Sequence, residues 1–178
     1  MRLDKLLGSQ AKADILKFLV FKREGISARA LENFLSWSFP SIKKQVDMLE
    51  SIGILHIDKN QQKWEIYLAD SFKPLLKRFL MDFLKWETQI TFEQYSWIEK
   101  YFLGKIFNPN LKVDVDLVIV HKPVEDRALA ALKEEINSLF ASYFLDNITI
   151  TFMLSSQFEL RYKMADKFVL SLLQISKN

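Results

Sequence analysis

The chain of 178 residues contains no cysteine and only four glycines. The absence of cysteine excludes disulfides, zinc sites built on thiolates and cysteine nucleophiles, and it fits a reducing compartment. With so few glycines at scattered positions, neither of the two common glycine-rich phosphate-binding loops can be written. The sequence therefore excludes the usual nucleotide-binding cradles.

Long apolar runs are also missing, because no stretch reaches the roughly 18 apolar residues that a membrane-spanning helix needs. The N-terminus carries charge at Arg2, Asp4 and Lys5 and has no apolar signal-peptide segment. What the chain does contain is 49% hydrophobic residues and 15 phenylalanines, enough for one full core or two small ones. We expect a soluble, cytoplasmic protein without a membrane partner.

Positive charge is concentrated in the first half of the chain. Residues 1–86 carry 15 Lys and Arg against 10 Asp and Glu, a net charge of +5. Residues 87–178 carry 10 against 12, a net charge of −2. A modestly basic half joined to a slightly acidic half favours a polyanionic partner for the first half.

Three short helices are expected in the first 51 residues, because apolar residues recur there at helical spacing. Ser9 and Ser27 are positioned to cap the first two helices, and Pro40 suits the first turn of the third. In the third helix, Ser41–Ser51, apolar side chains face inward and polar ones are left for solvent or a ligand. The expected buried face of the second helix consists of Ala30, Leu31, Phe34 and Leu35.

A β-hairpin is expected next, because β-forming runs at 54–57 and 64–68 flank a polar turn of six residues, 58–63. Three helices followed by a hairpin define a winged helix. In a helix-turn-helix the second helix of the motif enters the major groove, and a wing can reach the adjacent backbone. The expected DNA-contacting residues are therefore Ser41, Lys43, Lys44 and Gln45 on the third helix, with Lys59 and Lys63 in the wing.

Two segments of this half resemble a known family. Leu6–Leu16 resembles the opening of ArsR- and MarR-like winged-helix regulators, and Ser41–Leu55 is similar to their recognition helix and first wing strand. The resemblance covers about residues 5–70 and implies that residues 1–70 are the DNA-binding domain of a transcriptional regulator with double-stranded DNA as partner. Adjacent lysines more commonly form a solvated helix face, and winged helices also bind proteins, so a protein-interaction module is an alternative.

Residues 71–86 predict a strongly amphipathic linker helix, with charged residues on the face opposite an apolar stripe. Such a stripe packs against its own chain or against a second copy of the chain. The family resemblance favours the second copy and implies a homodimer. The stripe consists of Phe72, Leu75, Leu76, Phe79, Leu80, Phe83 and Leu84.

The remaining residues, 87–178, predict a small α/β domain. Asp114 and Asp116 occupy alternate positions of the first expected strand, so both carboxylates would share a face and could bind a divalent metal. Two carboxylates on one face repel, so a cation or a basic neighbour, Lys105 or Lys112, is expected to balance them. The expected elements are a helix within 91–107 that ends at Gly104, a strand over 113–120, a helix over 125–144, a strand over 148–152 and a closing helix over 158–173.

This second half resembles the minimal nucleotidyltransferase-like domain, in which a D-x-D pair holds magnesium and an upstream Gly-Ser turn contacts the triphosphate. Asp114 and Asp116 match the D-x-D pair, but Lys105 follows Gly104 where the serine is expected. The resemblance therefore implies a degenerate domain with no catalytic residue and no cofactor. The alternative is an active, magnesium-dependent nucleotidyltransferase whose winged helix recruits a substrate.

The sequence as a whole predicts the α+β class. Its expected parts are an N-terminal winged helix-turn-helix, an amphipathic linker helix and a C-terminal, small α/β nucleotidyltransferase-like domain. The expected function is DNA-binding transcriptional regulation.

Overall fold

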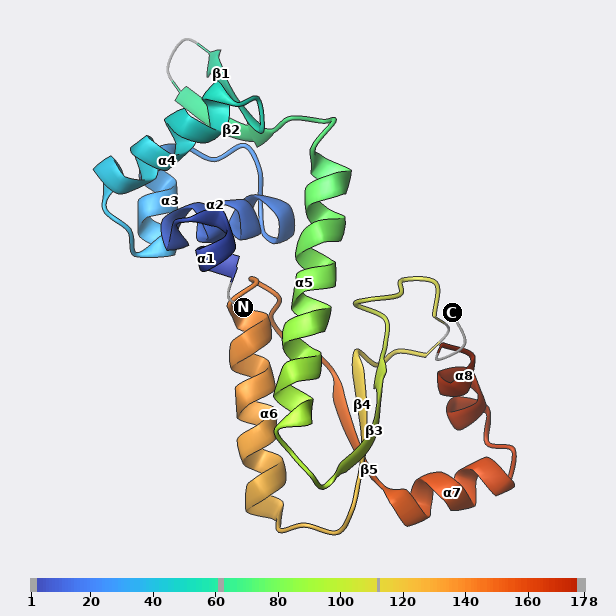
Figure 1. The fold of residues 1–178 in the computed structure, drawn as a ribbon. Helices are drawn as coiled ribbons and strands as arrows, with labels where there is room; N and C mark the ends of the chain where they lie inside the picture. Colours follow the sequence, from blue (N-terminus) through green and yellow to red (C-terminus); the bar gives the residue numbers. More distant parts are fainter. Residues whose placement is uncertain (1–2, 61–62, 112, 176–178) are drawn as a thin grey trace. The chain divides into compact units, whose positions relative to one another are not determined.

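A computed structural model describes residues 3–60, 63–111 and 113–175 of the chain (Figure 1). The chain divides into two compact units. Unit 1 comprises Met1–Leu84 together with Tyr143–Leu145, and unit 2 comprises Lys85–Ser142 together with Asp146–Asn178. None of the described helices is long and apolar enough to cross a membrane.

Unit 1 begins with the three predicted helices, preceded by one additional short helix. The Ser9 hydroxyl accepts a hydrogen bond from Lys12 N at 3.3 Å, and the Ser27 hydroxyl accepts one from Ala30 N at 3.2 Å, so both predicted caps are confirmed. Pro40 lies in the first turn of its helix, also as predicted. The four helices are α1 (Leu3–Leu7), α2 (Gln10–Phe21), α3 (Ala28–Leu35) and α4 (Phe39–Ser51).

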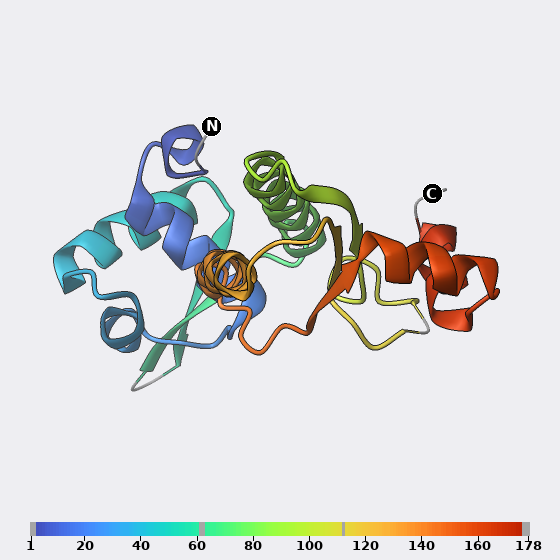
Figure 2. The same ribbon diagram turned by 90° about the horizontal axis from the view of Figure 1, so that it is seen from below.

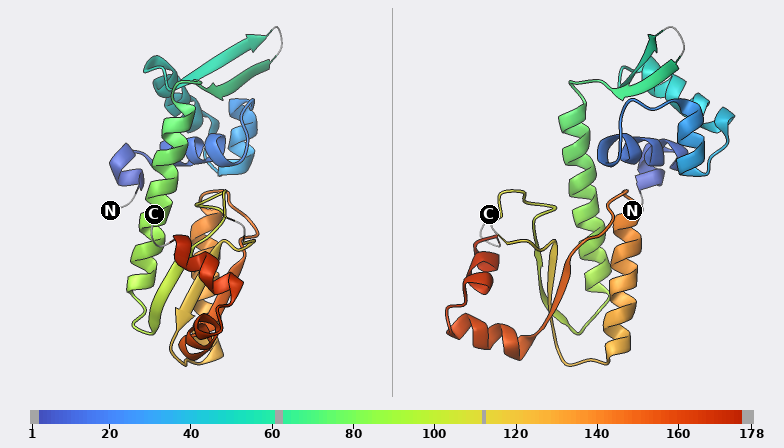
Figure 3. Two further views of the ribbon diagram at one scale, coloured as in Figure 1. Left: turned by 90° about the vertical axis from the view of Figure 1, so that its right-hand side faces the viewer. Right: turned by 180° about the vertical axis from the view of Figure 1, so that it is seen from behind.

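An antiparallel hairpin of β1 (Leu55–Asn60) and β2 (Lys63–Leu68) follows and projects beyond the helices of unit 1 (Figure 3). The predicted six-residue turn is wrong, because the register pairs Lys59 with Trp64 and Asn60 with Lys63. Side chains at the end of a hairpin meet water on both faces, so their polarity does not mark where backbone pairing stops. Ile26 adds an isolated bridge to Ile66 on the outer side of β2.

The core of unit 1 lies between α2, α3, α4 and the hairpin. The predicted inward face of α4 is confirmed, since Ile42, Val46 and Leu49 are all buried. Phe34 was expected in this core, but it is 56% exposed and packs against the Phe18 ring with a centroid distance of 5.2 Å. The remaining buried residues of this core are Ile15, Leu16, Phe18, Leu19, Ile26, Leu31, Leu35, Leu55, Ile66 and Leu68.

The segment Tyr143–Leu145 completes unit 1 by adding aromatic rings to α2. The Phe144 ring lies 5.2 Å from the Phe18 ring, and Lys17 Nζ lies 3.9 Å from the centroid of the fully buried Tyr143 ring. Three residues that are distant in sequence from the helix-turn-helix therefore belong to its packing.

The predicted linker helix is longer than expected and only partly buried. α5 runs over Lys73–Glu93, past the predicted end at residue 86. Leu80 and Leu84 are fully buried, whereas Leu75 is 64% exposed. A helix buries only the side that packs against a neighbour. The predicted apolar stripe of seven residues is wider than the buried side of α5, so part of the stripe is exposed.

Unit 2 contains a three-stranded sheet with the order β3-β4-β5. β3 is antiparallel to β4, and β4 is parallel to β5 through the crossover helix α6 (Asp126–Ala141). The predicted helix ending at Gly104 is wrong, because β3 occupies this place; the aromatic residues of the segment favour strands as well as packed helices. The three strands are β3 (Ile98–Leu103), β4 (Leu117–His121) and β5 (Ile150–Leu154).

Two helices, α7 (Ser155–Lys163) and α8 (Lys167–Ile175), replace the single closing helix that was predicted (Figure 2). Ala165 between them has a φ of 53°, which an uninterrupted α-helix does not allow. Leu160 and Leu170 were expected to pack but are 60% and 38% exposed. α7 and α8 contribute to a hydrophobic core of unit 2. Its buried residues are Phe102, Val118, Val120, Met153, Phe158, Val169 and Leu172.

Candidate nucleic-acid interface

The turn between α3 and α4 is fixed by hydrogen bonds to neighbouring helices. Ser36 ends α3 with a φ of 55°, which redirects the chain. Trp37 Nε1 donates to Asp14 Oδ2 at 3.0 Å, and Phe39 N donates to Glu32 Oε1 at 3.0 Å. Because these bonds join the turn to α2 and α3, they hold the start of α4 against the core of unit 1.

The predicted DNA-contacting residues of α4 differ in how available their charges are. Lys43 and Lys44 are exposed, while Ser41 and Gln45 are half-buried. Lys43 Nζ lies 2.6 Å from Asp47 Oδ2, so its charge is compensated within the helix. Lys44 has no ion-pair partner among the residues that the structure describes. The available positive charge on the outward face of α4 is therefore that of Lys44.

The wing contributes a second exposed lysine. Lys59 Nζ lies 5.1 Å from the centroid of the Trp64 ring, and Trp64 is its cross-strand partner. This cation–π contact draws the ammonium group toward the end of the hairpin while leaving it in water. Lys63 begins β2, but its side chain lies outside the described part of the structure.

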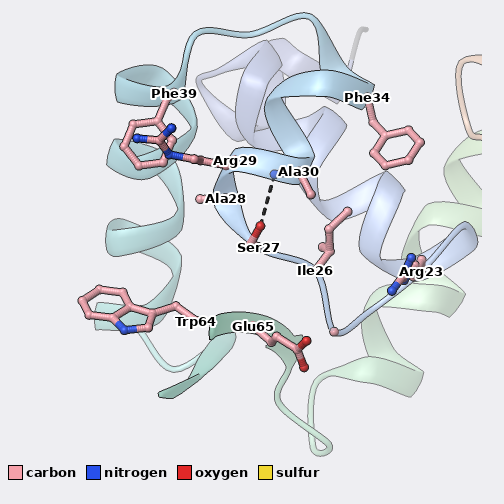
Figure 4. A pocket seen from close by; sticks show the side chains of 11 residues that line it. Arg23, Ile26, Ser27, Ala28, Arg29, Ala30, Phe34, Phe39, Trp64 and Glu65 are labelled. Carbon is pink, nitrogen blue, oxygen red and sulfur yellow. Dashed lines mark hydrogen bonds between the residues drawn. The ribbon is translucent and has the colours of Figure 1, made fainter. Parts of the chain in front are cut away.

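An open pocket with a volume of about 490 Å³ lies beside these residues, between the starts of α3 and α4 and strand β2 (Figure 4). Aromatic rings reach it from three different elements, and charged groups lie between them. The side chains that could recognise a ligand there are Arg23, Arg29, Phe34, Phe39, Trp64 and Glu65.

The sequence did not reveal this pocket, because the pattern of its apolar residues predicts that they are buried in the core. Trp64 shares a strand face with Ile66 and Leu68, which are buried, so alternation predicts that Trp64 is buried as well. Trp64 is nevertheless 60% exposed, because β2 extends past the edge of the core. Arg29 lies directly after the start of α3, and its Cζ is 5.5 Å from the centroid of the Phe39 ring. The available signal in the sequence was Arg29, a basic residue two positions after Ser27, the predicted helix cap.

The predicted metal ligands of unit 2 precede β4 instead of lying within it. The Asp114 side chain is 91% exposed, and its Oδ1 lies 2.7 Å from Lys105 Nζ. Asp116 Oδ2 accepts a hydrogen bond from Thr149 N at 2.9 Å. The hydrogen bond and charge of Lys105 hold the pKa of the Asp114 carboxyl below its ordinary value, and Asp114 raises the pKa of Lys105 in return.

Lys105 is therefore a balancing cation of the kind that the sequence predicted, while Lys112 lies outside the described residues. Among the residues that the structure describes, no three His, Cys, Asp or Glu side chains are grouped so that they could hold a metal. The metal site at Asp114 and Asp116 stays a prediction, and both carboxylates have partners within the chain.

Gly104 is required by a close approach of two backbone segments. A Cβ atom at this position would lie 1.9 Å from Val115 O. Gly104 N donates to Asp116 O at 2.7 Å, and Lys105 N donates to Val115 O at 2.8 Å. The close backbone pairing therefore explains why residue 104 is a glycine, without a role for Gly104 in a phosphate-binding turn.

The order of helices and strands within each unit defines the fold of that unit. In unit 1, helices α2 to α4 followed by the hairpin form a winged helix-turn-helix. In unit 2, a mixed sheet carries one helical crossover and two closing helices, so the chain is of the α+β class.

Comparisons with known proteins give structural neighbours only. No protein-family model and no curated protein matches the chain. The multiple antibiotic-resistance repressor MarR from Listeria monocytogenes 4b F2365 is 17% identical, with a TM-score of 0.39 over 78% of each chain. The transcriptional regulator SlyA is 11% identical, with a TM-score of 0.40 over 80% of this chain and 84% of SlyA.

Proposed function

We propose that this protein is a transcriptional regulator that binds double-stranded DNA through unit 1. The observation that carries the proposal is Lys44, an exposed lysine without an ion-pair partner in the described chain, on the second helix of a helix-turn-helix. That helix is the one that enters the major groove in this motif. The hydrogen bonds of Trp37 and Phe39 hold it in place before any ligand is bound.

The electrostatic attraction to DNA should be moderate. Lys43 is neutralised by Asp47, so Lys44 in α4 and Lys59 in the wing supply the accessible charge of the predicted set. Each phosphate neutralised by a lysine or arginine releases counterions and contributes about −0.9 to the slope of log affinity against log salt. A slope of about −2 per copy of the chain is expected for these two lysines.

A duplex titration across a salt series, with matched lysine variants, tests this proposal. Lys44→Gln should weaken binding several-fold and reduce the salt slope by about 1. Lys43→Gln should weaken it less, because Lys43 already has Asp47 as a partner. Lys133→Gln, an exposed lysine of α6, is the control with no expected effect. Absence of binding at low salt, or an equal response to all three variants, would contradict duplex recognition by α4 and favour a protein-interaction module.

We also propose that the protein acts as a homodimer through α5. The exposed apolar residues of and beside this helix recur at intervals of three, four and seven residues. The N-terminal half of α5 is basic and its C-terminal half is acidic overall, so antiparallel pairing with a second copy sets opposite charges against each other. A two-fold dimer would present two α4 helices to half-sites about one helical turn apart. The exposed residues are Phe72, Leu75, Phe79 and Trp86.

Light scattering across a concentration series tests the dimer. Leu75→Glu places a charge at the most exposed apolar position of α5 and should convert the dimer to a monomer. Leu160→Glu is the matched control, because Leu160 is equally apolar and is 60% exposed on α7. A monomer in the unmodified protein, or an unchanged mass for Leu75→Glu, would contradict this arrangement.

For unit 2 we propose a nucleotidyltransferase-like domain without catalytic activity. The engagement of Asp114 by Lys105 and of Asp116 by Thr149 N supports this proposal, because a magnesium ion would have to displace both partners. Calorimetric titration with Mg²⁺ and a nucleoside triphosphate should give no signal that depends on Asp114. Metal-dependent binding that is lost in Asp114→Asn would instead favour the active enzyme.

A further inference from the structure

We infer that the pocket of unit 1 binds an unpaired nucleotide, with the base stacked on Trp64, the phosphate held by Arg29, and Arg23 on the opposite side of the base. This site is separate in its chemistry from duplex recognition by Lys44. A base within a duplex is already paired and stacked, so it cannot offer its face to a protein ring.

The size and the walls of the pocket suit a ligand of this kind. Its volume of about 490 Å³ falls within the range of small-molecule pockets. Trp64 and Phe34 are 60% and 56% exposed, although rings of this size are normally covered. Figure 4 shows Trp64 and Phe39 on one side of the pocket and Arg23 on the opposite side. A flat ring that enters between them has an aromatic face on one side and a cation on the other.

Trp64 remains accessible. It also borders a smaller pocket of about 100 Å³, whose lining includes Val46, Ile57 and Ile66. Lys59 Nζ lies 5.1 Å from its ring centroid. Base stacking on an exposed aromatic ring flanked by basic groups is the usual way in which proteins bind unpaired nucleotides.

The charged groups of the pocket favour a phosphate. Arg23 and Arg29 have no ion-pair partner in the described parts of the chain. Guanidinium groups bind phosphate through two hydrogen bonds and also stack on rings, as Arg29 does on Phe39. The Ser27 hydroxyl accepts a hydrogen bond from Ala30 N, and its own O–H group can still donate to an anion beside Arg29.

Glu65 adds a hydrogen-bond acceptor for the base. One of its oxygens accepts a hydrogen bond from the Tyr67 hydroxyl at 2.8 Å. A carboxylate has about four acceptor positions, so others can accept from an exocyclic amino group. Glu65 also repels a phosphate placed next to it, which favours the phosphate at Arg29 and the base edge at Glu65.

The same chemistry is offered by a free nucleotide and by an unpaired nucleotide within a strand. We would therefore titrate the protein with AMP and with a short single-stranded DNA oligonucleotide of mixed sequence. Adenosine and ribose 5-phosphate are the partial ligands, and each should bind more weakly than AMP because it lacks either the phosphate or the base. Binding of AMP at least as strong as that of the oligonucleotide identifies the free nucleotide as the ligand, whereas binding of the oligonucleotide alone identifies the strand.

Variants of the pocket complete the experiment. Trp64→Ala should weaken binding by about 5-fold to 100-fold, and Trp64→Phe should recover most of the affinity. Arg29→Gln should weaken binding and reduce its salt dependence. Tyr162→Ala is the matched control, because Tyr162 is an aromatic residue of unit 2 with 54% exposure. Circular dichroism of each variant confirms that the fold is retained.

The inference is overturned if neither probe binds, or if Trp64→Ala binds as tightly as the unmodified protein. Lys44→Gln should leave nucleotide binding unchanged while it weakens duplex binding. A failure of duplex recognition therefore leaves the pocket intact as a proposal, and a failure of the pocket leaves duplex recognition intact.

Discussion

The two units differ in what their charged side chains do. In unit 1, Lys44 and Arg29 are exposed and have no ion-pair partner in the described chain, and Arg29 lies over the Phe39 ring. In unit 2, the residues whose pattern suggested chemistry, Asp114 and Asp116, bind Lys105 and the backbone of the same chain. Charges without partners are free to bind a ligand at little desolvation cost, whereas charges with partners must first lose them. This difference supports the proposal that unit 1 binds the ligand and that the motif of unit 2 has a structural role.

The largest expected effect concerns the support of α4. Ile42 is fully buried, so Ile42→Ala should lower the free energy of unfolding of unit 1 by about 2–5 kcal/mol. Leu160→Ala, at a position with 60% exposure, should change the free energy by less than about 0.5 kcal/mol. Urea unfolding followed by circular dichroism measures both. Equal effects of the two substitutions would mean that the buried face of α4 does not hold the helix in place. The proposal that the outward face of α4 is arranged before a ligand binds would then be contradicted.

A smaller but still clear effect is expected in unit 2. Gly104→Ala forces a Cβ atom against Val115 O, a backbone atom that cannot rotate away. We expect a loss of about 1–3 kcal/mol, together with disturbed pairing between residues 104–105 and 115–116. Gly8→Ala is the control, because a Cβ atom there meets nothing within 4 Å and only the φ of 71° opposes it. Unchanged stability of Gly104→Ala would remove the structural explanation for this glycine and reopen the question of a phosphate turn.

The cap of α3 should give an effect of intermediate to small size. Ser27→Ala removes the hydrogen bond to Ala30 N and should cost about 1 kcal/mol. Because Arg29 lies in the first turn that this cap holds, nucleotide binding should weaken together with stability. Ser156→Ala, at an exposed serine of α7, is the matched control. A loss of stability without any loss of nucleotide binding would place the ligand away from the start of α3.

Local signals in the sequence predicted much of unit 1. Ser9 and Ser27 mark helix starts through their side-chain hydroxyls, and Pro40 does so through its fixed φ, so the helix-turn-helix was correctly predicted without knowledge of the packing. The strand β3 was not predicted, because its tyrosine and phenylalanine suit a strand and a packed helix equally well.

The candidate sites depended more strongly on three-dimensional information. The Lys43–Asp47 pair is four residues apart on one helix and was accessible to sequence reasoning. The Lys105–Asp114 pair spans a turn, so its contact could only be suggested from charge balance. Trp64 shows the limit most clearly, since alternation places it with Ile66 on the core side and only the length of β2 leaves it exposed.

The smallest effect is a shift in the titration of Asp114. Lys105 lowers the pKa of this carboxyl, so Lys105→Gln should raise the pKa toward its ordinary value. A carboxyl with a lowered pKa in the folded state contributes stability above its unfolded pKa of about 3.9, and this contribution is lost as the pH falls through the lowered value. Because Asp114 is exposed, solvent screens the pair and the effect on stability is small.

Carboxyl ¹³C NMR of Asp114 across the acidic range measures this titration directly. The pKa of Asp114 should rise in Lys105→Gln and stay low in Lys133→Gln, which alters a lysine of α6. A pKa that does not respond to Lys105→Gln would mean that the ion pair is not maintained in solution. Asp114 would then be free to bind a cation. The difference between unit 1, with Lys44 and Arg29 unpaired among the described residues, and unit 2, with its paired carboxylates, would no longer hold.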